Sequence, residues 1–567
     1  MTDQRRRWWA WASLASGIVV LGWTLWLAAS GKGWAIEILG LRISSRDPFR
    51  SLLAGTFLTG VGLSPIRIPW EEHRKNRWAS TSAAALAVMT FLLGVMYGSF
   101  VAGASDAYGY VSQASLWANG SVIVPAPLAA DTTWPDGASA FTPVGYRPAR
   151  QPGWMVPVYP PGLPLTMAAM KLLFGERGVY FVVPLLGGLA VWLTYWLGRE
   201  IYDCAAGLFA AAALAASPVF LLQLMAPMTD VPVTAWWLMS IVMALKRRTG
   251  WLVASGFMTA AAVITRPNLL FLGLPLFALV LHQTGNVSSR MRRALMWGLP
   301  ASTGPIAVAI ISSRLYGSPL ASGYGSLNSL YSLDYTWRNT TQYIDWIVTT
   351  HTPFMLLGIF AMPWLVRGAA PGTRWLIGWS FMFAACVFVS YLWYQPFDNW
   401  SYLRFLLPAY PMLLAASAAA VLMLARRYDW SEGFVLALAS LLVCAGLWNG
   451  RLAFQMAEGE ARYVKAAEAA RSLPSNAVVI SNLHSGSVRY YADRLTLRYE
   501  SLGADEYGTA LQYLRDRGRP VYAMLDEAEV DTFRQRYRDV GDVSWLDKPP
   551  LVSPANRVYL YLIAEGR

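Results

Sequence analysis

The sequence predicts a polytopic α-helical membrane protein with a small α/β domain at its C-terminal end. Of its 567 residues, 55% are hydrophobic and only 14% are charged, whereas soluble proteins carry roughly 25% charged residues. Long apolar runs alternate with short basic clusters, and the chain holds 27 Trp and 28 Tyr, residue types that gather at membrane interfaces. These observations exclude a disordered chain, a secreted disulfide-linked domain and a soluble multi-domain enzyme.

The apolar runs are sufficient for about 13 crossings of a bilayer, because one helical span needs about 20 mostly apolar residues. The expected spans, in chain order, are Trp8–Ala29, Ser51–Ile68, Ala79–Val101, Tyr180–Leu197, Gly207–Met228, Val233–Leu245, Trp251–Thr265, Leu269–Leu281, Leu295–Ile311, Phe354–Leu365, Trp375–Tyr394, Phe405–Leu424 and Phe434–Leu447. The stretch Leu163–Phe174 is too short to span, so we expect a re-entrant or surface helix there.

Basic residues indicate the orientation of these spans, since Lys and Arg concentrate in cytoplasmic loops. One threading places Arg5–Arg7, Lys246–Arg248, Arg290–Arg293 and Arg426–Arg427 in the cytoplasm and the C-terminus outside. This topology also accounts for the net charge of +13, so we do not expect nucleic-acid binding.

The composition changes after Gly450, and residues 451–567 are charged and mixed. Strand-like runs alternate with helical patterns, which is typical of a small α/β domain. The strands are expected at Ala477–Ser481, Leu495–Tyr499, Val521–Leu525 and Val558–Ile563, and the helices at Glu460–Arg471, Asp505–Arg517 and Glu527–Tyr537. The chain therefore divides into N-terminal anchor helices (1–78), a transmembrane domain with a large outer loop at 103–162 (79–450) and an extracytoplasmic α/β domain (451–567).

Four charged residues lie at the ends of spans on the outer face: Asp106, Asp230, Arg266 and Arg404. Each has an ordinary explanation when taken alone, because acids cap helices and arginines at an interface reach toward lipid phosphate. Charged groups at membrane depth are nevertheless costly and mark functional sites. Because all four fall on the same side of the expected topology, we expect them to form one site.

The order of the motifs around these residues resembles the GT-C membrane glycosyltransferases, above all the protein O-mannosyltransferase and lipid A aminoarabinose transferase branches. The resemblance covers roughly residues 79–425. It rests on Gly103-Ala-Ser-Asp106, Tyr159-Pro-Pro-Gly162, Ala216-Ser-Pro218, Met228-Thr-Asp230-Val-Pro232, Thr265-Arg-Pro267 and Asp398-Asn-Trp-Ser-Tyr402-Leu-Arg404-Phe-Leu-Leu-Pro408.

The resemblance implies a sugar donor linked to polyprenyl phosphate and an acceptor hydroxyl on a glycan, lipid or protein. Asp106 matches the family's first-loop acid and is expected as the general base. Asp230 matches the second acid, which orients the acceptor or joins Asp106 in holding Mg²⁺ or Mn²⁺. Arg404 and Arg266 are expected to bind the donor phosphate. A bacterial inner membrane with a periplasmic active face also follows from the resemblance.

Three aromatic residues are expected to contact substrate: Tyr108, Tyr159 and Tyr402. Tyr159 precedes the Pro-Pro pair, where the aminoarabinose transferases carry Lys. A phosphate contact is therefore expected from Arg147 or Arg150 in the same loop instead.

These roles agree with the chemistry of glycosyl transfer. A guanidinium is always charged and can bind two oxygens of a leaving phosphate at once. A carboxylate that hydrogen-bonds the attacking hydroxyl can take its proton as the new bond forms. Direct attack opposite the departing phosphate predicts inversion at the anomeric carbon.

The sequence leaves two other classes open. A transporter or flippase for lipid-linked glycans would place its charges midway through the membrane, within interrupted helices and internal repeats. A structural membrane subunit would carry its function in the C-terminal domain, and Asp106→Asn would then be silent.

Overall fold

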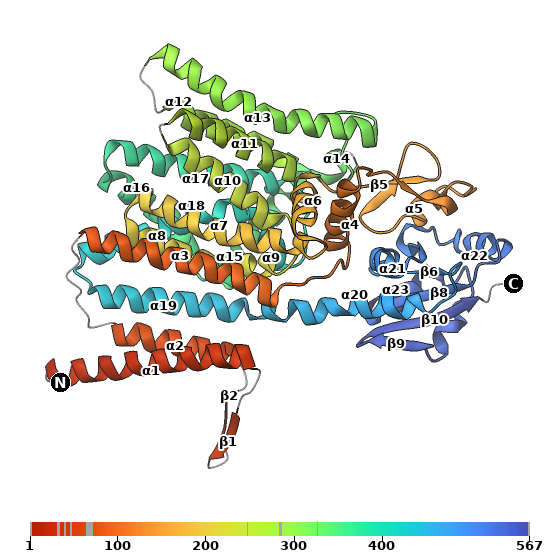
Figure 1. The fold of residues 1–567 in the computed structure, drawn as a ribbon, viewed down its shortest axis with the longest axis horizontal. Helices are drawn as coiled ribbons and strands as arrows, with labels where there is room; N and C mark the ends of the chain where they lie inside the picture. The colour runs from red at the N-terminus through yellow and green to blue at the C-terminus, as the bar shows by residue number, and fades with distance from the viewer. Residues whose placement is uncertain are drawn as a thin grey trace.

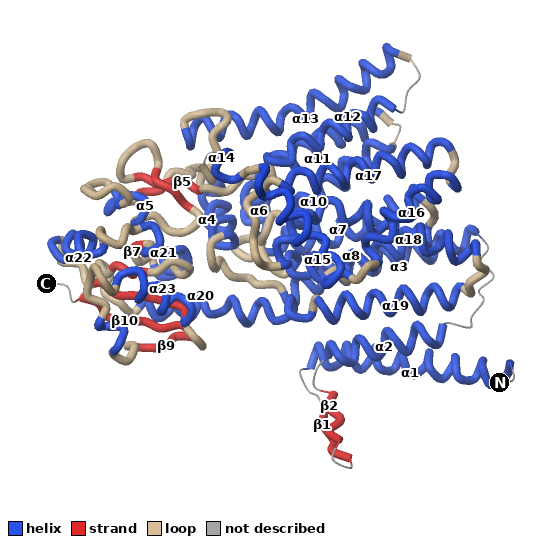
Figure 2. The backbone as a smooth tube through the Cα atoms, turned by 180° about the vertical axis from the view of Figure 1, so that it is seen from behind, coloured by secondary structure: helices blue, strands red, loops and turns tan. Residues whose placement is uncertain are grey.

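The computed structural model describes residues 3–30, 34–38, 41–45, 48–63, 72–246, 248–282, 286–325 and 327–564. Ile68 and Arg247, which the sequence analysis places in a span and in a basic cluster, lie outside these residues. Most of the described chain is helical (Figure 2). A bundle of roughly parallel and antiparallel helices forms the body, with the C-terminal domain at one end and an N-terminal helix pair along one side (Figure 1).

The N-terminal unit consists of two packed helices, α1 (Asp3–Ser30) and α2 (Pro48–Leu63), joined by the hairpin β1 (Trp34–Ile38) and β2 (Leu41–Ser45). The two strands are antiparallel, with Trp34 opposite Ser45. A Cβ atom on Gly62 would lie 2.4 Å from the amide nitrogen of Leu14. Small residues allow this close approach of two apolar helices, as is common between helices in membranes.

Within the described part of residues 72–449, the membrane bundle contains thirteen helices of at least seven residues. The helices of the large outer loop, and the helix directly after that loop, are not counted among them. The thirteen helices are α3 (Glu72–Tyr97), α7 (Gly178–Ile201), α8 (Cys204–Ala215), α9 (Pro218–Leu224), α10 (Asp230–Leu245), α11 (Thr249–Thr265), α12 (Gly273–His282), α13 (Val287–Tyr316), α15 (Thr336–His351), α16 (Phe354–Gly368), α17 (Pro371–Leu392), α18 (Tyr410–Arg427) and α19 (Glu432–Asn449). Two 3₁₀ segments, η2 (Pro267–Leu272) and η4 (Trp400–Ala409), precede α12 and α18.

By length and composition, seven helices in the described part of the chain can cross a membrane, or up to nine if each bent pair is one span. Several further apolar helices are shorter, among them α10, α11 and the segment Pro267–His282. The number of thirteen crossings therefore stays a prediction, whereas the helical membrane character of the chain is clear.

One expected span, Gly207–Met228, is broken in the structure. Helices α8 and α9 meet at an angle of 61°, because Ser217 caps α9 by accepting a hydrogen bond from the Phe220 amide and Pro218 occupies the first helical position. A second break separates α15 from α16 by 106°. His351 joins the two breaks, since its Nε2 lies 2.8 Å from the Ser217 hydroxyl oxygen.

The large loop between α3 and α7 forms a layer of its own over one end of the bundle (Figure 1). It contains α4 (Asp106–Ala118), the short α5 (Gly137–Ala140) and a three-stranded antiparallel sheet, and α6 (Gly162–Phe174) follows it. The strand order is β3 (Val124–Pro125), β5 (Trp154–Pro157) and β4 (Tyr146–Pro148). Helix α6 corresponds to Leu163–Phe174, the stretch that the sequence analysis describes as too short for a span.

After α19 the chain continues through α20 (Met456–Arg471) into a five-stranded sheet. The strand order is β7 (Leu495–Leu497), β6 (Val478–Ile480), β8 (Val521–Asp526), β10 (Val558–Ala564) and β9 (Val552–Ala555). Strand β6 runs parallel to β7 and β8, while β10 is antiparallel to its neighbours. Three helices connect the strands, namely α21 (Ser485–Ala492), α22 (Tyr507–Asp516) and α23 (Glu527–Tyr537).

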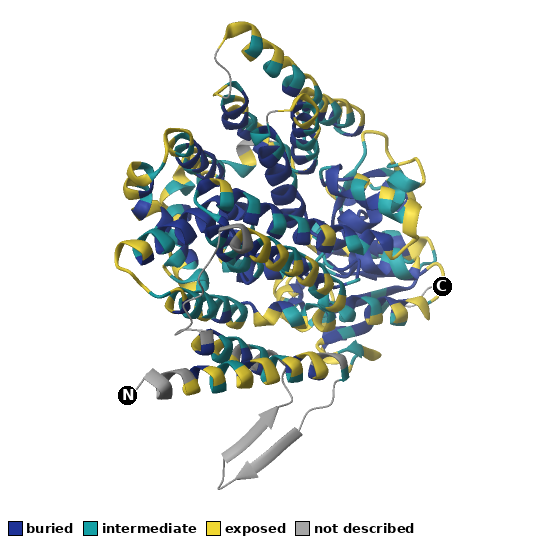
Figure 3. Ribbon diagram, turned by 60° about the vertical axis from the view of Figure 1, so that its left-hand side comes forward, coloured by how far each residue is buried: buried dark blue, intermediate teal, exposed yellow. Residues whose placement is uncertain are grey.

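The core lies in the middle of the bundle and in the C-terminal sheet, where Figure 3 shows the buried residues. Helix α18 is buried almost throughout and contacts α16, α8 and α7. Helices α10 and α18 begin near the C-terminal domain and end at Leu245 and Arg427 (Figure 1). Lys246 and the Arg426–Arg427 pair therefore lie at the end of the bundle remote from that domain.

Candidate active site

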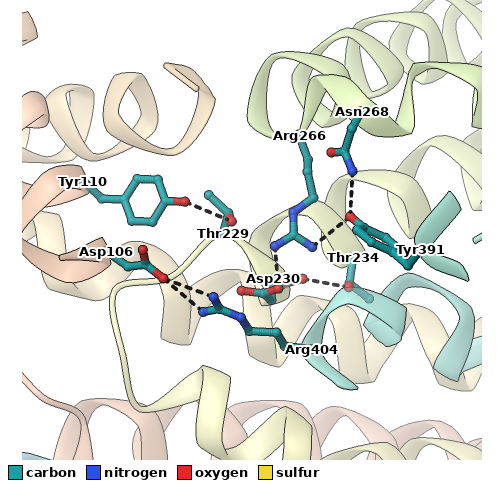
Figure 4. Close-up of polar contacts among 9 residues, drawn as sticks. All are labelled: Asp106, Tyr110, Thr229, Asp230, Thr234, Arg266, Asn268, Tyr391 and Arg404. Carbon is teal, nitrogen blue, oxygen red and sulfur yellow. Dashed lines mark hydrogen bonds and ion pairs between the residues drawn. The ribbon is translucent and has the colours of Figure 1, made fainter. Parts of the chain in front are cut away.

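Three helix ends and the 3₁₀ segment η4 bring the charged residues of the sequence analysis together (Figure 4). Asp106 is the first residue of α4 and Asp230 the first of α10. Arg266 follows α11 directly, because Pro267 comes next and disfavours continuation of the helix. Arg404 comes from η4, just before α18. The expectation that these residues form one cluster agrees with this arrangement.

Asp106 is held by two partners. Both terminal nitrogens of Arg404 donate to Asp106 Oδ2, at 3.1 and 3.2 Å. The Tyr159 hydroxyl donates to Asp106 Oδ1 at 2.6 Å, and it also lies 2.8 Å from the Ser105 hydroxyl oxygen. The Asp106 side chain remains 33% exposed, so a substrate can reach it.

Asp230 is fully buried and pairs with a different arginine. Arg266 Nη2 donates to Asp230 Oδ1 at 2.6 Å, and the two side chains are 12% and 0% exposed. Asp230 Oδ2 has no hydrogen-bond partner within the described residues. Arg404 interacts electrostatically with both carboxylates. The cluster thus holds two acids and two guanidinium groups, whose formal charges cancel.

Aromatic side chains surround these ion pairs. The Phe405 ring lies 5.3 Å from the guanidinium carbon of both Arg266 and Arg404, a distance at which a cation interacts favourably with a ring. Tyr391 stacks on Phe405 at 5.0 Å, and its hydroxyl accepts hydrogen bonds from Asn268 at 3.0 Å and Arg266 at 3.4 Å. These contacts fix the direction of both guanidinium groups.

Sequence patterns assign no role to four of these residues: Thr229, Asn268, Tyr391 and Phe405. A fifth, Tyr110, is one of the loop aromatic residues that could stack on a sugar. Tyr110 lies one helical turn after Asp106, a spacing that places both residues on one face of α4. Its hydroxyl lies 3.4 Å from the Thr229 hydroxyl oxygen, next to Asp230. This spacing links Tyr110 to Asp106, whereas Tyr391 lies in an apolar helix without any local signal.

Burial raises the pKa of Tyr159 well above its ordinary value, and the negative charge of Asp106 raises it further. The Tyr159 hydroxyl therefore stays protonated at neutral pH and can only donate to the Asp106 carboxylate. The Tyr159-Pro-Pro-Gly162 motif also packs beside Arg266, because a Cβ on Gly162 would lie 2.4 Å from the Thr265 amide nitrogen.

Tyr108, expected to contact substrate, points away from the ion pairs. It is buried, and it packs against Gly486, Tyr146 and Tyr490, two of which belong to α21. Its position two residues after Asp106 explains the difference, since residues at this spacing do not share a helix face.

Of the other residues expected to contact substrate, Tyr402 lies beside the cluster, whereas Arg147 and Arg150 contact a different part of the chain. Tyr402 stacks on Phe397 at 3.8 Å and lies 5.1 Å from the guanidinium carbon of Arg404, so it borders the site. Arg147 donates to the carbonyl of Ser322 at 3.2 Å. Arg150 is exposed and contacts Gly317. These two arginines thus contact the turn after α13, whereas Asp106 and Asp230 pair with Arg404 and Arg266.

A divalent cation does not fit the described donor set. Among the residues that the structure describes, no three His, Cys, Asp or Glu side chains are grouped so that they could hold a metal ion. The two carboxylates face guanidinium groups instead. Hard divalent cations such as Mg²⁺ or Mn²⁺ prefer several oxygen ligands, which these two ion-paired carboxylates do not offer.

This arrangement of membrane helices, loop layer and α/β domain defines a fold class, and solved structures share it. The chain is similar to ArnT from Cupriavidus metallidurans bound to undecaprenyl phosphate, with 12% identity and a TM-score of 0.51 over 85% of this chain and 97% of that one. It is similar to the archaeal oligosaccharyltransferase AglB from Archaeoglobus fulgidus, in complex with an inhibitory peptide and a dolichol-phosphate, with 13% identity and a TM-score of 0.51 over 83% and 72%. The chain therefore shares its fold with these two proteins.

A family model matches part of the chain at the sequence level. Residues 158–316 match the family described as dolichyl-phosphate-mannose-protein mannosyltransferase. This segment includes Tyr159, Asp230 and Arg266 but neither Asp106 nor Arg404. No curated protein matches the sequence.

Proposed function

We propose that the protein is a membrane glycosyltransferase that moves a sugar from a polyprenyl-phosphate donor to an acceptor hydroxyl. The observation that carries this proposal is the Asp106 carboxylate, one-third exposed and held between Tyr159 and Arg404 at the same end of the bundle as Arg266. Undecaprenyl phosphate and dolichol-phosphate bound to the similar ArnT and AglB structures support the donor class.

Arg404 and Arg266 bind the donor phosphate in this proposal. Glycosyl transfer moves negative charge onto the departing phosphate, and a guanidinium can bind two of its oxygens with fixed geometry. Phe405 and Tyr391 hold both guanidinium groups in place before the donor arrives. The groups therefore need little reorganisation as charge develops.

Asp106 acts as the general base. It accepts the hydroxyl proton of the acceptor while that oxygen forms a bond to the anomeric carbon and the bond to the phosphate oxygen breaks. The Tyr159 hydroxyl donates to one oxygen of Asp106 and leaves the other to interact with Arg404 or the acceptor. A single displacement of this kind inverts the anomeric configuration. Asp230, which is fully buried, orients Arg266 and does not act as a base.

We place the site and the C-terminal domain on the extracytoplasmic side of a bacterial inner membrane. Lys246, Arg426 and Arg427 lie at the opposite end of the bundle, as the positive-inside rule requires of a cytoplasmic face. The charged residues lie at three helix ends and in η4 on one side of the bundle, rather than midway through the membrane within interrupted helices, which favours an enzyme over a transporter.

The test is sugar transfer by the purified protein in nanodiscs, with a panel of polyprenyl-phosphate pentoses and hexoses and host membrane extract as acceptor. Asp106→Asn is expected to lower kcat by about 10²- to 10⁴-fold, the range of a lost general base. Asp203→Asn is the matched control, because Asp203 pairs with Arg426 at the opposite end of the bundle. Equal activity of wild type and Asp106→Asn, or a product with retained configuration, would contradict the mechanism.

A further inference from the structure

The C-terminal domain packs directly on the segment that carries Asp106. The Ala102 amide donates to the Tyr491 hydroxyl at 2.7 Å. A Cβ on Gly103 would lie 2.4 Å from Cδ2 of Tyr463 in α20, and a Cβ on Gly486 would lie 2.2 Å from Cδ1 of Tyr108. Contacts from α20 and α21 therefore lie on both sides of Asp106 along the chain.

The backbone between these contacts is strained. Ala104 has a φ of +48°, in the left-handed region that is unfavourable for a residue with a Cβ. Such a conformation persists only where surrounding contacts hold it. The Ala102 hydrogen bond and the packing of Tyr463 on Gly103 act on the two residues before Ala104, and the Asp106 carboxylate follows two residues later.

Helix α21 also contacts the loop segment that packs against Tyr159, the partner of Asp106. The Val144 amide donates to the Ser485 hydroxyl at 3.1 Å, and Arg489 donates to the Phe141 carbonyl at 2.8 Å. Gly145, which follows Val144 in the chain, has a φ of +79°. A Cβ there would lie 3.2 Å from both the Ser105 carbonyl oxygen and the Tyr159 ring. One helix of the C-terminal domain therefore reaches both sides of the Asp106–Tyr159 hydrogen bond.

We propose that the C-terminal domain positions the general base, with Gly486 and Tyr491 as its positioning residues. This inference rests on the proposed function, because it concerns the geometry of Asp106 during transfer. Gly486 leaves room for the Tyr108 ring, and Tyr491 fixes the Ala102 amide, so that the start of α4 lies at one position relative to Arg404. A displacement of about 1 Å in a reacting group can lower a rate by about 10²-fold.

The first test is Gly486→Ala in the full-length protein. The added methyl group pushes the Tyr108 ring, and kcat is expected to fall about 10- to 100-fold. The KM for the donor is expected to stay within about threefold, because the phosphate-binding residues come from η4 and the end of α11. Gly508→Ala is the matched control, since Gly508 lies in α22 of the same domain and a Cβ there meets nothing within 4 Å. Its kcat is expected to equal that of the wild type.

The clash between the methyl group added in Gly486→Ala and the Tyr108 ring can also be relieved by shortening the side chain at position 108. Tyr108→Leu in the Gly486→Ala background is expected to recover part of kcat, because the shorter side chain no longer meets the methyl group. A general loss of folding would not be recovered in this way. Tyr491→Phe provides a second variant that keeps the ring but removes the acceptor of the Ala102 amide. Its expected effect is a three- to tenfold lower kcat, the size of one net hydrogen bond, about 1 kcal/mol.

The outcomes separate the two levels of the proposal. A wild-type protein that transfers no sugar from any donor counts against the proposed function. Turnover by the wild type with unchanged kcat in Gly486→Ala and Tyr491→Phe overturns the positioning role. A fall in kcat that is matched by a lower melting temperature, and is not recovered by Tyr108→Leu, also overturns it.

Discussion

The two aspartate–arginine pairs of the site have the same chemistry but different surroundings. The Asp230–Arg266 pair lies inside the bundle, with side chains 0% and 12% exposed, and its 2.6 Å contact is supported by Tyr391 and Asn268. The Asp106–Arg404 pair is 33% and 17% exposed, its contacts are 3.1 and 3.2 Å, and its acid belongs to the loop layer. The second pair joins two layers of the molecule, whereas the first lies within one.

This difference indicates which pair can react. A buried ion pair costs much free energy to break, because either partner left alone is an uncompensated charge in an apolar surrounding. A partly exposed pair can exchange partners with a charged substrate at lower cost. We therefore interpret Asp106–Arg404 as the pair that exchanges partners during the reaction. The Asp230–Arg266 pair is interpreted as the support of the site, which stays intact while Arg266 contacts the donor phosphate.

The largest expected effect tests the supporting pair. Asp230→Asn leaves the Arg266 guanidinium buried without its counter-charge, and the free energy of unfolding is expected to fall by about 3–5 kcal/mol. Asp106→Asn is expected to lower it by about 1 kcal/mol or less, because a partly exposed pair contributes little. Unfolding of both variants in detergent by added denaturant measures the difference. Equal losses would remove the distinction between the two pairs.

The next effect concerns the reactive pair. Arg404→Lys keeps a positive charge but loses the fork that binds two oxygens. We expect kcat/KM for the donor to fall about 10- to 100-fold, somewhat less than the 10²- to 10³-fold that accompanies loss of a whole donor to developing charge. Steady-state kinetics with varied donor provide the measurement. Activity within twofold of wild type would indicate that Arg404 does not bind the phosphate.

The ionisation of Tyr159 makes the stability of this part of the site depend on pH. Its folded pKa is raised by burial and by Asp106, so its protonated hydroxyl contributes stability below about pH 10, the ordinary tyrosine pKa. This contribution is lost as pH rises above that value. Tyr159→Phe is expected to lower kcat by about tenfold, the scale of a hydrogen bond to a charged group, and to weaken the alkaline loss of stability. Melting temperatures between pH 8 and about 11 check the second expectation, given the reference pKa of about 10.

The smallest effect concerns the backbone before Asp106. Ala104→Gly places a residue without a Cβ at a φ of +48°, and the relief of strain is expected to raise the free energy of unfolding by about 1 kcal/mol. A small rise in melting temperature is the expected observation. A clear fall would mean that the Ala104 methyl group contributes packing that outweighs the strain.

The sequence could predict the positions of the four charged residues, because each adjoins an apolar run and the topology places those ends on one side. It could not predict the pairing. Asp106 and Arg404 are 298 residues apart, and their contact depends on where the tertiary fold places the start of α4 relative to η4. Asp230 and Arg266 are 36 residues apart, yet the choice of partner depends on the packing of α10, α11 and η4.

The break between α8 and α9 shows a different limit. Average hydropathy across Gly207–Met228 is high enough for a span, and it hides the capping signal of Ser217 followed by Pro218. Reading that pair as a helix start would have predicted the bend. Strands β6, β7, β8 and β10, by contrast, lie where the sequence predicts strands, because short β-branched runs between helical patterns carry a clear local signal.

The contact of both Arg404 nitrogens with Asp106 has a kinetic consequence. In the proposed mechanism, the donor phosphate and the Asp106 carboxylate compete for the same N–H groups of Arg404, so donor binding releases the carboxylate oxygen that the acceptor needs. The base is thereby freed by the substrate whose reaction requires it. Addition of substrates is then compulsorily ordered, with the donor first. Polyprenyl phosphate, the last product to leave, is expected to inhibit competitively against the donor and non-competitively against the acceptor.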